Sequence, residues 1–388
     1  MPSGAAALQV GAVGDFSATA WWPLRAVLLG LVVLALAGTV LAFRRPTGWP
    51  LRTVAVGAAA VLVLVNAAAA VNAHYDYFPT LGEALGGPPP GTTSLAEAEA
   101  RRGRVPDRGA VVPLHLPATR SGVDARDAQV YLPPVWFARP RPALPVVVLL
   151  HGTPGAPTDW VEGGRAAVSA DAWAARHDGR APVLVMPDVN GSVTGDSECA
   201  DSPRGDWETY LTGDVPAAIV RILGTQPPGR AWAVAGLSEG GTCAMVLALR
   251  HPELFTAFGQ YSGLAGPRVG DSNGDTASTV EELFGGSQQA FDQHEPTSLL
   301  ADPGDRYRAL GAWFEVGGND SQPLEAARAL APLTRQAGID TCLVVVPGGQ
   351  HTFTVWSAAL RASLPFLTAR IGMVPQTADM TSRCTTPP

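Results

Sequence analysis

Two long runs of uncharged, apolar residues near the N-terminus constrain this 388-residue chain more than any other feature. The first run spans residues 26–43 and the second spans residues 53–71. As a helix, the first run reaches about 27 Å, which is close to the thickness of a bilayer core. The second run is less hydrophobic because it is rich in alanine. The sequence therefore predicts a two-helix transmembrane hairpin over residues 26–72.

Charged residues beside these runs predict the orientation of the hairpin. The connecting loop holds Arg44, Arg45 and Arg52, whereas only Arg25 lies close outside the pair. Under the positive-inside rule, the loop faces the cytoplasm and both chain ends lie outside, including an extracytoplasmic N-terminal segment at 1–25. Tryptophans stand at the ends of the runs, as interfacial aromatic side chains do: Trp21, Trp22 and Trp49.

Two other interpretations of these runs stay open. Val71, Asn72 and Ala73 resemble the small-x-small cleavage site of a signal sequence, which would make the second run a cleaved leader. A buried hairpin in a soluble core is the third interpretation. Both membrane interpretations place the remaining chain outside the cytoplasm, where cysteines pair.

Composition divides the rest of the chain into three parts. Residues 73–108 are rich in proline, glycine and polar residues, which predicts a linker because such sequence does not continue a helix or a sheet interior. Residues 109–372 alternate between apolar runs and helix-like stretches and form one predicted domain. The polar residues 373–388 predict a poorly ordered tail.

The apolar runs of the long middle part are typical of strands in a parallel sheet. PALPVVVLLHG at 142–152 is unbroken and ends at glycine, as a strand buried on both faces does. Helix-like stretches lie between such runs, at 162–176, 207–223, 240–250, 321–337 and 354–370. This alternation predicts an α/β fold, in which helices cover both faces of a mostly parallel sheet.

Charge and composition exclude several functions. A net charge of −7 and a pI near 5.5 argue against a nucleic-acid partner, which needs a basic face. All 27 basic residues are arginine, so the chain has no lysine for a Schiff base, a phosphate-binding loop or a Ser-x-x-Lys site. A general base must therefore be histidine or a carboxylate. The four cysteines show no C-x-x-C spacing of a zinc site, and we expect no cofactor.

A G-x-S-x-G motif predicts the nucleophile. GLSEG at 236–240 follows the apolar run AWAVA and precedes an apolar-periodic helix, which is the context of a serine on a sharp strand-to-helix turn. A second match, GDSNG at 270–274, lacks that context and makes Ser272 a decoy. Ser238 is thus the candidate nucleophile, and a helix N-cap is the alternative role for its hydroxyl.

The same chain order predicts the base and the acid. His351 follows the last apolar run, as the order Ser, acid, His requires, although a surface histidine at a helix start is the alternative. Asp320 comes directly after the run AWFEVGGN and is the candidate acid. Glu325 is its main rival, and Glu315 falls inside the predicted strand.

An oxyanion site needs two backbone N–H donors. One comes from the residue after the nucleophile, which is Glu239. The other comes from the loop HGTPGAPTDW after an early strand, where Gly152 and Gly155 allow the backbone to approach the site and Thr153 is the candidate donor.

Several segments resemble the esterase D and mycolyltransferase branch of the α/β-hydrolases. They are VYLPP at 130–134, LLHGTPGAPTDW from Leu149, WETYLTGDVP at 207–216, GLSEGGTCA from Gly236, and PGGQH ending at His351. The resemblance covers residues 110–372. It implies the α/β-hydrolase fold and serine ester chemistry, with Ser238, Asp320 and His351 as a triad and with Thr153 and Glu239 as oxyanion donors. In the mycolyltransferases, a sugar hydroxyl takes the place of water.

We therefore expect a membrane-anchored, extracytoplasmic serine esterase whose partners are an acyl-ester or lipid substrate and the cell membrane. An acyltransferase that uses the same residues on an envelope carbohydrate is the first alternative. A catalytically silent envelope-binding protein is an alternative of another class. A peptidase is disfavoured because no propeller or large lid precedes the predicted domain.

Two lesser patterns complete the reading of the sequence. Residues 271–282 place oxygen side chains at positions 1, 3, 5 and 12 of a calcium-loop template, but a solvated acidic loop is favoured because Thr276 replaces the turn glycine and no helix precedes the segment. The cysteines predict two disulfides, and their places beside the strand ends favour Cys199 with Cys243 and Cys342 with Cys384. Buried free thiols are the alternative.

Overall fold

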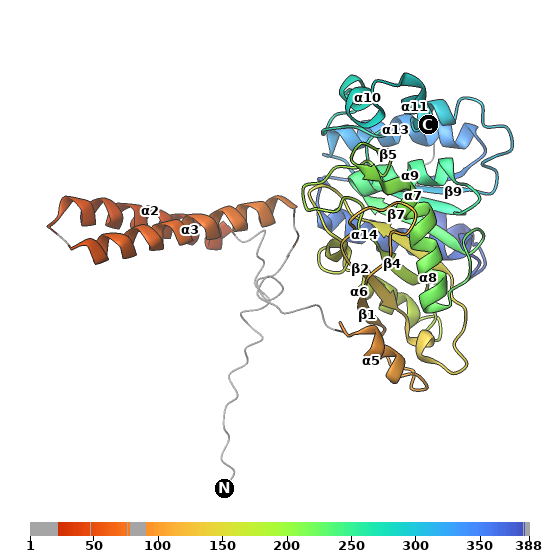
Figure 1. Cartoon of the computed structure of the whole chain (residues 1–388), viewed down its shortest axis with the longest axis horizontal. Helices are drawn as coiled ribbons and strands as arrows, with labels where there is room; N and C mark the ends of the chain where they lie inside the picture. The colour runs from red at the N-terminus through yellow and green to blue at the C-terminus, as the bar shows by residue number, and fades with distance from the viewer. Residues whose placement is uncertain (1–21, 47, 76, 78–90, 383, 385–388) are drawn as a thin grey trace, which may run out of the picture. The chain divides into compact units, whose positions relative to one another are not determined.

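The computed structural model describes residues 22–46, 48–75, 77, 91–382 and 384. Its residues form two compact units, Met1–Pro88 and Pro89–Pro388, which are treated separately below. Residues 1–21 of the predicted N-terminal segment, which include Trp21, lie outside the described residues, as do residues 76 and 78–90 of the predicted linker and residues 383 and 385–388 of the tail (Figure 1). Residues 22–25 of the predicted N-terminal segment form the start of the first helix.

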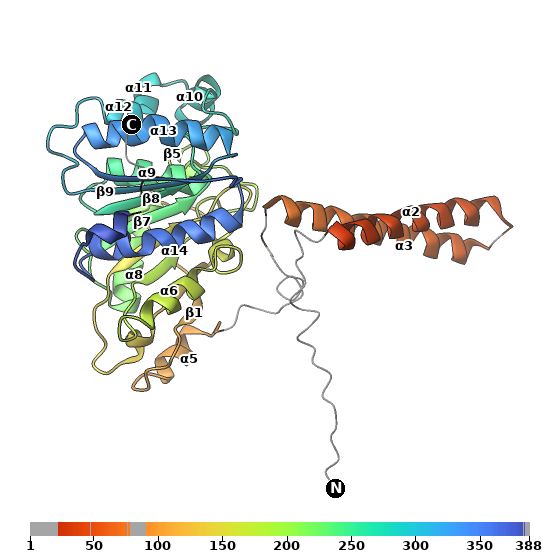
Figure 2. The same ribbon diagram turned by 180° about the vertical axis from the view of Figure 1, so that it is seen from behind.

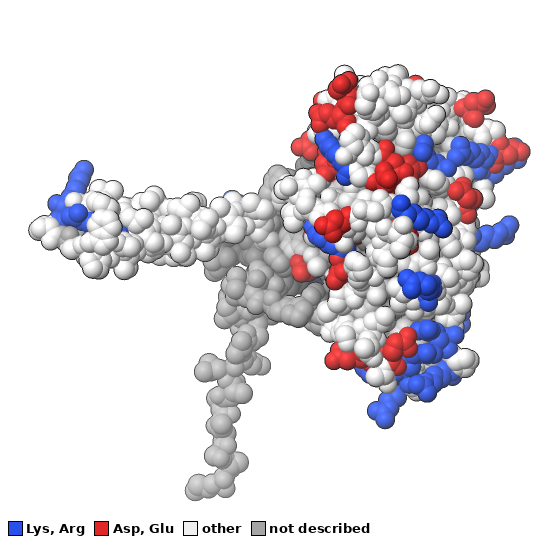
Figure 3. Space-filling model, viewed as in Figure 1, with Lys and Arg blue, Asp and Glu red and all other residues white. Residues whose placement is uncertain are grey.

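The first unit contains the predicted hairpin as two paired helices, α2 (Trp22–Arg44) and α3 (Trp49–Tyr75). Both are long and apolar enough to cross a membrane, over Arg25–Arg44 and Trp49–Ala73, and only 6% of each span is buried. Such exposure disfavours the interpretation of a soluble core hairpin. On the face seen in Figure 3, charged side chains of the hairpin gather at one end only.

Polar side chains inside the hairpin are used to join its two helices. Asn66 Nδ2 donates to the Leu28 carbonyl at 3.0 Å, and Thr39 Oγ1 donates to the Ala55 carbonyl at 3.1 Å. A polar atom in hydrocarbon needs a partner within the protein, so these bonds suit a pair of helices surrounded by lipid.

The second unit is built on an eight-stranded sheet with the order β1-β2-β4-β3-β7-β8-β9-β10. Strand β2 pairs antiparallel with β1 and β4. The strands β4, β3, β7, β8, β9 and β10 run parallel to one another. The strands are β1 (Ala110–Leu114), β2 (Ala128–Leu132), β3 (Val146–Leu150), β4 (Val183–Met186), β7 (Trp232–Leu237), β8 (Ala257–Tyr261), β9 (Gly311–Gly317) and β10 (Asp340–Val346). This confirms the predicted mostly parallel sheet.

Helices cover both faces of the sheet. Figure 2 shows α13 and α14 on opposite sides of β8 and β9. Helix α6 packs against α14, whereas α8 and α9 share one hydrophobic core cluster with α13. The long helices are α6 (Ala166–Ala174), α8 (Val215–Leu223), α9 (Glu239–Arg250), α13 (Ser321–Gln336) and α14 (Phe353–Arg370). The predicted α/β fold class is thereby confirmed.

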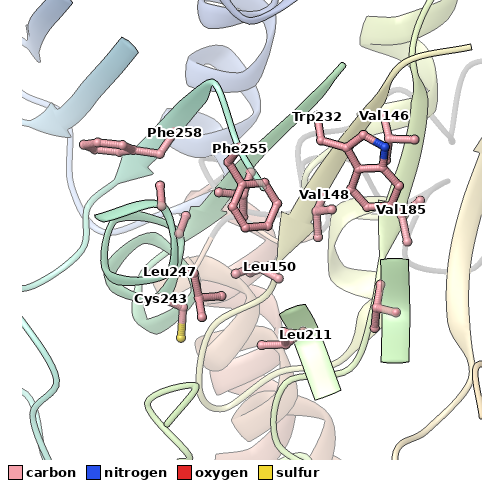
Figure 4. Packing of buried hydrophobic residues seen from close by; sticks show 14 of the residues in the cluster. Val146, Val148, Leu150, Val185, Leu211, Trp232, Cys243, Leu247, Phe255 and Phe258 are labelled. Atoms are coloured by element: carbon pink, nitrogen blue, oxygen red, sulfur yellow. The ribbon is translucent and has the colours of Figure 1, made fainter. Parts of the chain in front are cut away.

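The core explains why the central strands are apolar throughout. Every residue of β3 is buried. Val146, Val148 and Leu150 belong to one hydrophobic cluster with Trp232 of β7 and Leu247 of α9, on the face of the sheet that α9 covers (Figure 4). The residues between them face the opposite side, because successive side chains of a strand alternate. A strand buried on both faces loses its polar alternation, which is the pattern that marked it in the sequence.

Several short elements were not predicted. Residues 91–108, predicted as linker, are a packed part of the second unit. Thr92 forms a bridge with Val111, and α5 (Leu95–Ala100) buries Ala98 completely. A capping box between Ser94 and Glu97 starts that helix, and this local signal was overlooked. The other unpredicted elements are β5 (Asp201–Ser202), β6 (Gly205–Asp206), α10 (Thr276–Phe284), α11 (Gln288–Asp292), α12 (Pro296–Leu299), and the short turns η1 (Pro134–Phe137), η2 (Pro157–Trp160) and η4 (Ala378–Thr381). The predicted helical stretch 207–223 is present as α7 (Trp207–Thr209), η3 (Tyr210–Asp214) and α8 in succession.

The buried carboxylate of Glu208 joins α7 to the end of α9 and to the segment after α11. Glu208 of α7 accepts hydrogen bonds from Arg250 Nε at 2.6 Å and His251 Nε2 at 2.7 Å, and its other oxygen lies 3.0 Å from His294 Nε2. Burial raises the pKa of Glu208, but bonds from the two histidines and Arg250 outweigh it and hold that pKa well below its usual value. The bond to Glu208 raises the pKa of His251. His251 thus serves a structural ion pair.

We expect Glu208→Gln to lower the free energy of unfolding by on the order of 2 kcal/mol, because it removes the charge that compensates Arg250 and the histidines. A histidine whose pKa is higher in the folded protein than in the unfolded chain contributes its full stabilisation at pH values below the unfolded pKa. That contribution is lost as the pH rises through the folded pKa. Glu208, with a lowered pKa, keeps its charge over that range. The loss in Tm of the detergent-solubilised protein is therefore largest near about pH 6 and shrinks toward about pH 9.

The matched control is Glu253→Gln, because Glu253 also bonds His251 but its side chain is 65% exposed. An exposed pair contributes little, so this variant keeps the wild-type Tm within about 1 °C. A loss of Tm in Glu208→Gln that is equal at all pH values would contradict the assigned role of His251.

Candidate active site

A strained turn between β7 and α9 holds the candidate nucleophile. Ser238 has φ 53° and ψ −125°, a conformation that residues with a side chain rarely adopt. Its N–H donates to the Tyr261 carbonyl at 2.9 Å, which fixes the turn against β8. A Cβ on Gly236 would lie 1.9 Å from the Gly240 carbonyl oxygen, so the turn closes only around glycines. The motif therefore adopts the predicted elbow.

The Ser238 hydroxyl points to a histidine. Ser238 Oγ lies 2.9 Å from His351 Nε2 and makes no capping bond to α9. The start of α9 is satisfied by the backbone instead, since Gly241 N and Thr242 N both donate to the Ser238 carbonyl. The N-cap alternative for this hydroxyl is therefore wrong.

The same histidine contacts the candidate acid. His351 Nδ1 lies 2.8 Å from Asp320 Oδ2. The Asp320 side chain is 7% exposed and that of His351 is 34% exposed, so the carboxylate is shielded while the imidazole remains open to a substrate. The ring edge of His351 also packs against Trp356, with centroids 4.8 Å apart. Ser238, His351 and Asp320 thus form one continuous hydrogen-bonded chain.

Two loops at the ends of β9 and β10 bring the acid and the histidine together. Gly318 N donates to the Val346 carbonyl and Asn319 N donates to the Gly349 carbonyl, both at 2.8 Å. A Cβ on Gly317 would lie 2.4 Å from the Gly349 carbonyl oxygen. The glycine pairs in VGGND and PGGQH therefore allow the two backbones to touch, which aligns the side chains that follow them.

The rival residues lie elsewhere. Glu325 is on the exposed side of α13, and Glu315 is fully buried within β9. Ser272 Oγ accepts a bond from Gly274 N at 3.2 Å in the loop before α10. None of these three side chains bonds to Ser238 or His351 among the residues that the structure describes.

The predicted oxyanion loop lies directly beside the nucleophile. A Cβ on Gly152 would be 2.9 Å from the Cβ of Ser238, so this glycine lets the loop approach the elbow. Thr153 follows in the loop, and Glu239 is the first residue of α9. Within the described part of the chain, neither Thr153 N nor Glu239 N donates a hydrogen bond. The positive end of the α9 dipole lies at the same place.

Hydrogen bonds among His151, Asp188 and Arg126 hold the predicted oxyanion loop in place. His151 and Asp188 are both completely buried, with His151 Nε2 3.1 Å from Asp188 Oδ1 and His151 Nδ1 2.8 Å from the Gly152 carbonyl. Arg126 donates to both Asp188 oxygens and to the Gly155 carbonyl. Burial raises the pKa of Asp188, but bonds from Arg126 and His151 outweigh it and lower that pKa far below its usual value.

Sequence reasoning placed His151 in the loop but missed both Asp188 and Arg126. The available signal for Asp188 was its position just past the apolar run APVLVM, at the carboxyl edge of the sheet where sites of α/β proteins lie. Nothing in the local sequence around Arg126 indicates its role, because its partners are 25 to 62 residues away.

The cysteines are paired as favoured, Cys199 with Cys243 and Cys342 with Cys384. The first bond joins the loop after β4 to α9, and the second joins the tail to β10. The tail is thus attached at Cys384, contrary to the expectation of poor order throughout 373–388. Part of the predicted acidic loop 271–282 is also helical, in α10, because its TVEELF segment buries one apolar face.

The calcium-loop pattern does not assemble. Asn273 uses its side chain to accept from Ala265 N and to donate to the Gln322 carbonyl. The described residues contain no group of three or more His, Cys, Asp or Glu side chains that could hold a metal ion.

Comparison with known proteins agrees with this geometry. The Esterase family model matches residues 123–367. An uncharacterized protein of Corynebacterium glutamicum is 36% identical over 327 residues, which cover 81% of this chain and 75% of that protein. The diacylglycerol acyltransferase/mycolyltransferase Ag85A of Mycobacterium ulcerans is 29% identical over 200 residues, which cover 45% of this chain and 58% of that protein.

Solved structures show the same fold. A ferulic acid esterase superimposes with a TM-score of 0.56 at 22% identity, covering 68% of this chain and 98% of that one. The family match extends over more than half of the chain and contains the elbow, the oxyanion loop and both loops that carry Asp320 and His351. The chain therefore belongs to the Esterase family of α/β-hydrolases, and it is a serine ester hydrolase or acyltransferase.

Proposed function

We propose that this protein is a membrane-anchored, extracytoplasmic serine esterase that acts on acyl esters through Ser238, His351 and Asp320. The observation that carries this proposal is the continuous chain of hydrogen bonds from the Asp320 carboxylate through His351 to a hydroxyl on a strained elbow. A hydroxyl becomes a useful nucleophile only when an oriented base takes its proton, and this chain supplies both the base and its orientation.

Acylation forms the first covalent intermediate. Ser238 Oγ attacks the ester carbonyl carbon while its proton moves to His351 Nε2, and the carbonyl electron pair moves onto oxygen. Asp320 holds the imidazole by its Nδ1–H and stabilises the imidazolium. The backbone N–H groups of Thr153 and Glu239 donate hydrogen bonds to the negative oxygen. Collapse of this intermediate expels the alcohol, which takes the proton from His351.

Deacylation repeats these steps with a second nucleophile. His351 takes a proton from water, the resulting oxygen attacks the acyl carbon, and the acid is released as Ser238 regains its proton. A hydroxyl of another molecule in place of water gives acyl transfer. The likeness to a diacylglycerol acyltransferase/mycolyltransferase supports transfer as the second candidate function.

The membrane part of the proposal rests on the first unit and on the cysteines. Helices α2 and α3 meet the length and apolarity of membrane spans, and the loop between them carries Arg44, Arg45 and Arg52. Under the positive-inside rule, this charge pattern supports a cytoplasmic loop and an enzyme domain outside the cytoplasm. Both disulfides support the same side, because such bonds persist in oxidising compartments.

The nucleophile is tested by Ser238→Ala. We expect hydrolysis of a p-nitrophenyl acyl ester by the solubilised full chain to fall by at least about 10⁴-fold, and covalent labelling by a fluorophosphonate probe to disappear. Ser272→Ala is the matched control and keeps both. Wild-type protein that takes up no probe would favour the catalytically silent alternative.

The acid is tested by comparing Asp320→Asn with Glu325→Gln. Asparagine at 320 still bonds the ring but stabilises neither the required tautomer nor the imidazolium, so we expect kcat to fall by about 10³ to 10⁴-fold. Glu325 lies on the exposed side of α13, and its variant retains wild-type kcat. The reverse ranking of the two variants would assign the acid to Glu325.

The topology is tested with a reporter phosphatase that folds only outside the cytoplasm. Fused after Pro388 in a bacterial host, the reporter should be active, whereas inserted at Gly48 between the two helices it should be inactive. An inactive C-terminal fusion together with an active loop insertion would reverse the proposed orientation.

A further inference from the structure

Side chains link the two residues that carry the proposed oxyanion donors. Glu239 Oε2 lies within hydrogen-bond distance of Thr153 Oγ1, although the two residues are 86 positions apart. Asn190 Nδ2 donates to that same carboxyl oxygen at 2.8 Å and also lies against Thr153 Oγ1. The loop after β3 and the start of α9 are therefore joined through side chains as well as packed together.

The loop after β4 closes this cluster on its other side. Glu239 Oε1 accepts from Ser197 N at 3.3 Å and from Glu198 N at 3.2 Å, and Thr153 Oγ1 lies 2.6 Å from the Gly195 carbonyl. All of these groups are buried or half-buried. The Glu239 carboxyl group at the start of α9 thus contacts both the loop after β3 and the loop after β4.

A count of protons shows how the cluster is satisfied. The Thr153 hydroxyl has one proton and faces three neighbours: the Asn190 amide, which donates to it, the Gly195 carbonyl, which only accepts, and the Glu239 carboxyl. A neutral Glu239 donates to Thr153, which in turn donates to Gly195. Burial, together with the nearby charge of Asp196, raises the pKa of Glu239 to about 7, so this form is populated near neutral pH.

We propose that Thr153, Asn190 and Glu239 form an oxyanion clamp, a positioning unit that fixes the distance between the backbone N–H groups of Thr153 and Glu239. The proposal rests on the proposed function, because it assigns these N–H groups to the developing oxyanion. Both N–H groups belong to residues whose own side chains are bonded to each other, so movement of one loop relative to α9 would break the clamp.

Such a clamp has a distinct kinetic signature. The oxyanion exists only in the tetrahedral intermediates and the transition states that flank them, so donor alignment affects kcat more than substrate binding. Misplacement by about 1 Å is enough to cost up to about 10²-fold in rate. A residue that merely supports the fold would instead change Tm and KM.

Matched variants separate the hydrogen bonds from the packing. Thr153→Val removes the hydroxyl and keeps the shape, whereas Thr153→Ser keeps the hydroxyl. Glu239→Leu removes both carboxyl oxygens, whereas Glu239→Gln retains an acceptor and a donor that replaces the proton of the neutral acid. Glu281→Gln, at an exposed position of α10, is the control for loss of a carboxylate.

The test uses solubilised full chain, steady-state kinetics on a p-nitrophenyl ester, and inhibition by an aryl trifluoromethyl ketone. Ser238 Oγ adds to the ketone carbon, its proton passes to His351, and the resulting oxyanion occupies the proposed site. We expect Thr153→Val and Glu239→Leu each to lower kcat by about 10-fold or more, with KM within about threefold and weaker ketone inhibition to match. Thr153→Ser, Glu239→Gln and Glu281→Gln stay within about threefold of wild type.

The double variant Thr153→Val/Glu239→Leu completes the test. Because the two side chains act as one unit, it should be no slower than the worse single variant by more than about threefold. Wild-type kcat and ketone affinity in Thr153→Val would overturn the clamp, and so would losses in the double variant that multiply. If Glu239→Leu does not fold, as shown by circular dichroism, Thr153→Val alone decides, since it removes a single oxygen. Esterase activity retained by Ser238→Ala would instead contradict the proposed function itself.

Discussion

The site depends on close contact between backbones at the carboxyl edge of the sheet. A Cβ on Gly240 would lie 2.3 Å from the Leu150 carbonyl oxygen, and one on Gly152 would lie 2.9 Å from Ser238 Cβ. These glycines let α9 start against the end of β3, so that the nucleophile and the oxyanion loop are neighbours. A side chain at either position would separate Ser238 from one of the proposed N–H donors, whatever the remaining residues were.

The same constraint explains which parts of the site could be predicted. Ser238, Asp320 and His351 each follow an apolar run and a glycine-containing turn, and parallel strands bring their carboxyl ends to one edge. Their order along the chain therefore indicated their meeting place. Glycines in a tight turn leave a local pattern, so this part of the site could be predicted from the sequence.

The supporting residues leave no such pattern. Asn190 meets Glu239 across 49 positions and Arg126 meets Asp188 across 62, so their roles arise only when distant loops fold together. The helices α10 to α12 have only nine, five and four residues, so each gives a brief pattern in the sequence. Polar networks that position a site are specified by tertiary contacts, whereas strands and elbows are specified by neighbours in the chain.

The disulfide between Cys199 and Cys243 adds a condition to this arrangement. It attaches the loop that bonds Glu239 and Thr153 to the helix that begins at the nucleophile. A newly made chain with reduced thiols holds that loop by hydrogen bonds alone, and thiols stay reduced in the cytoplasm. Under the proposed topology, this loop becomes covalently attached to α9 only after the chain has left the cytoplasm, so export is a condition for the final geometry of the site.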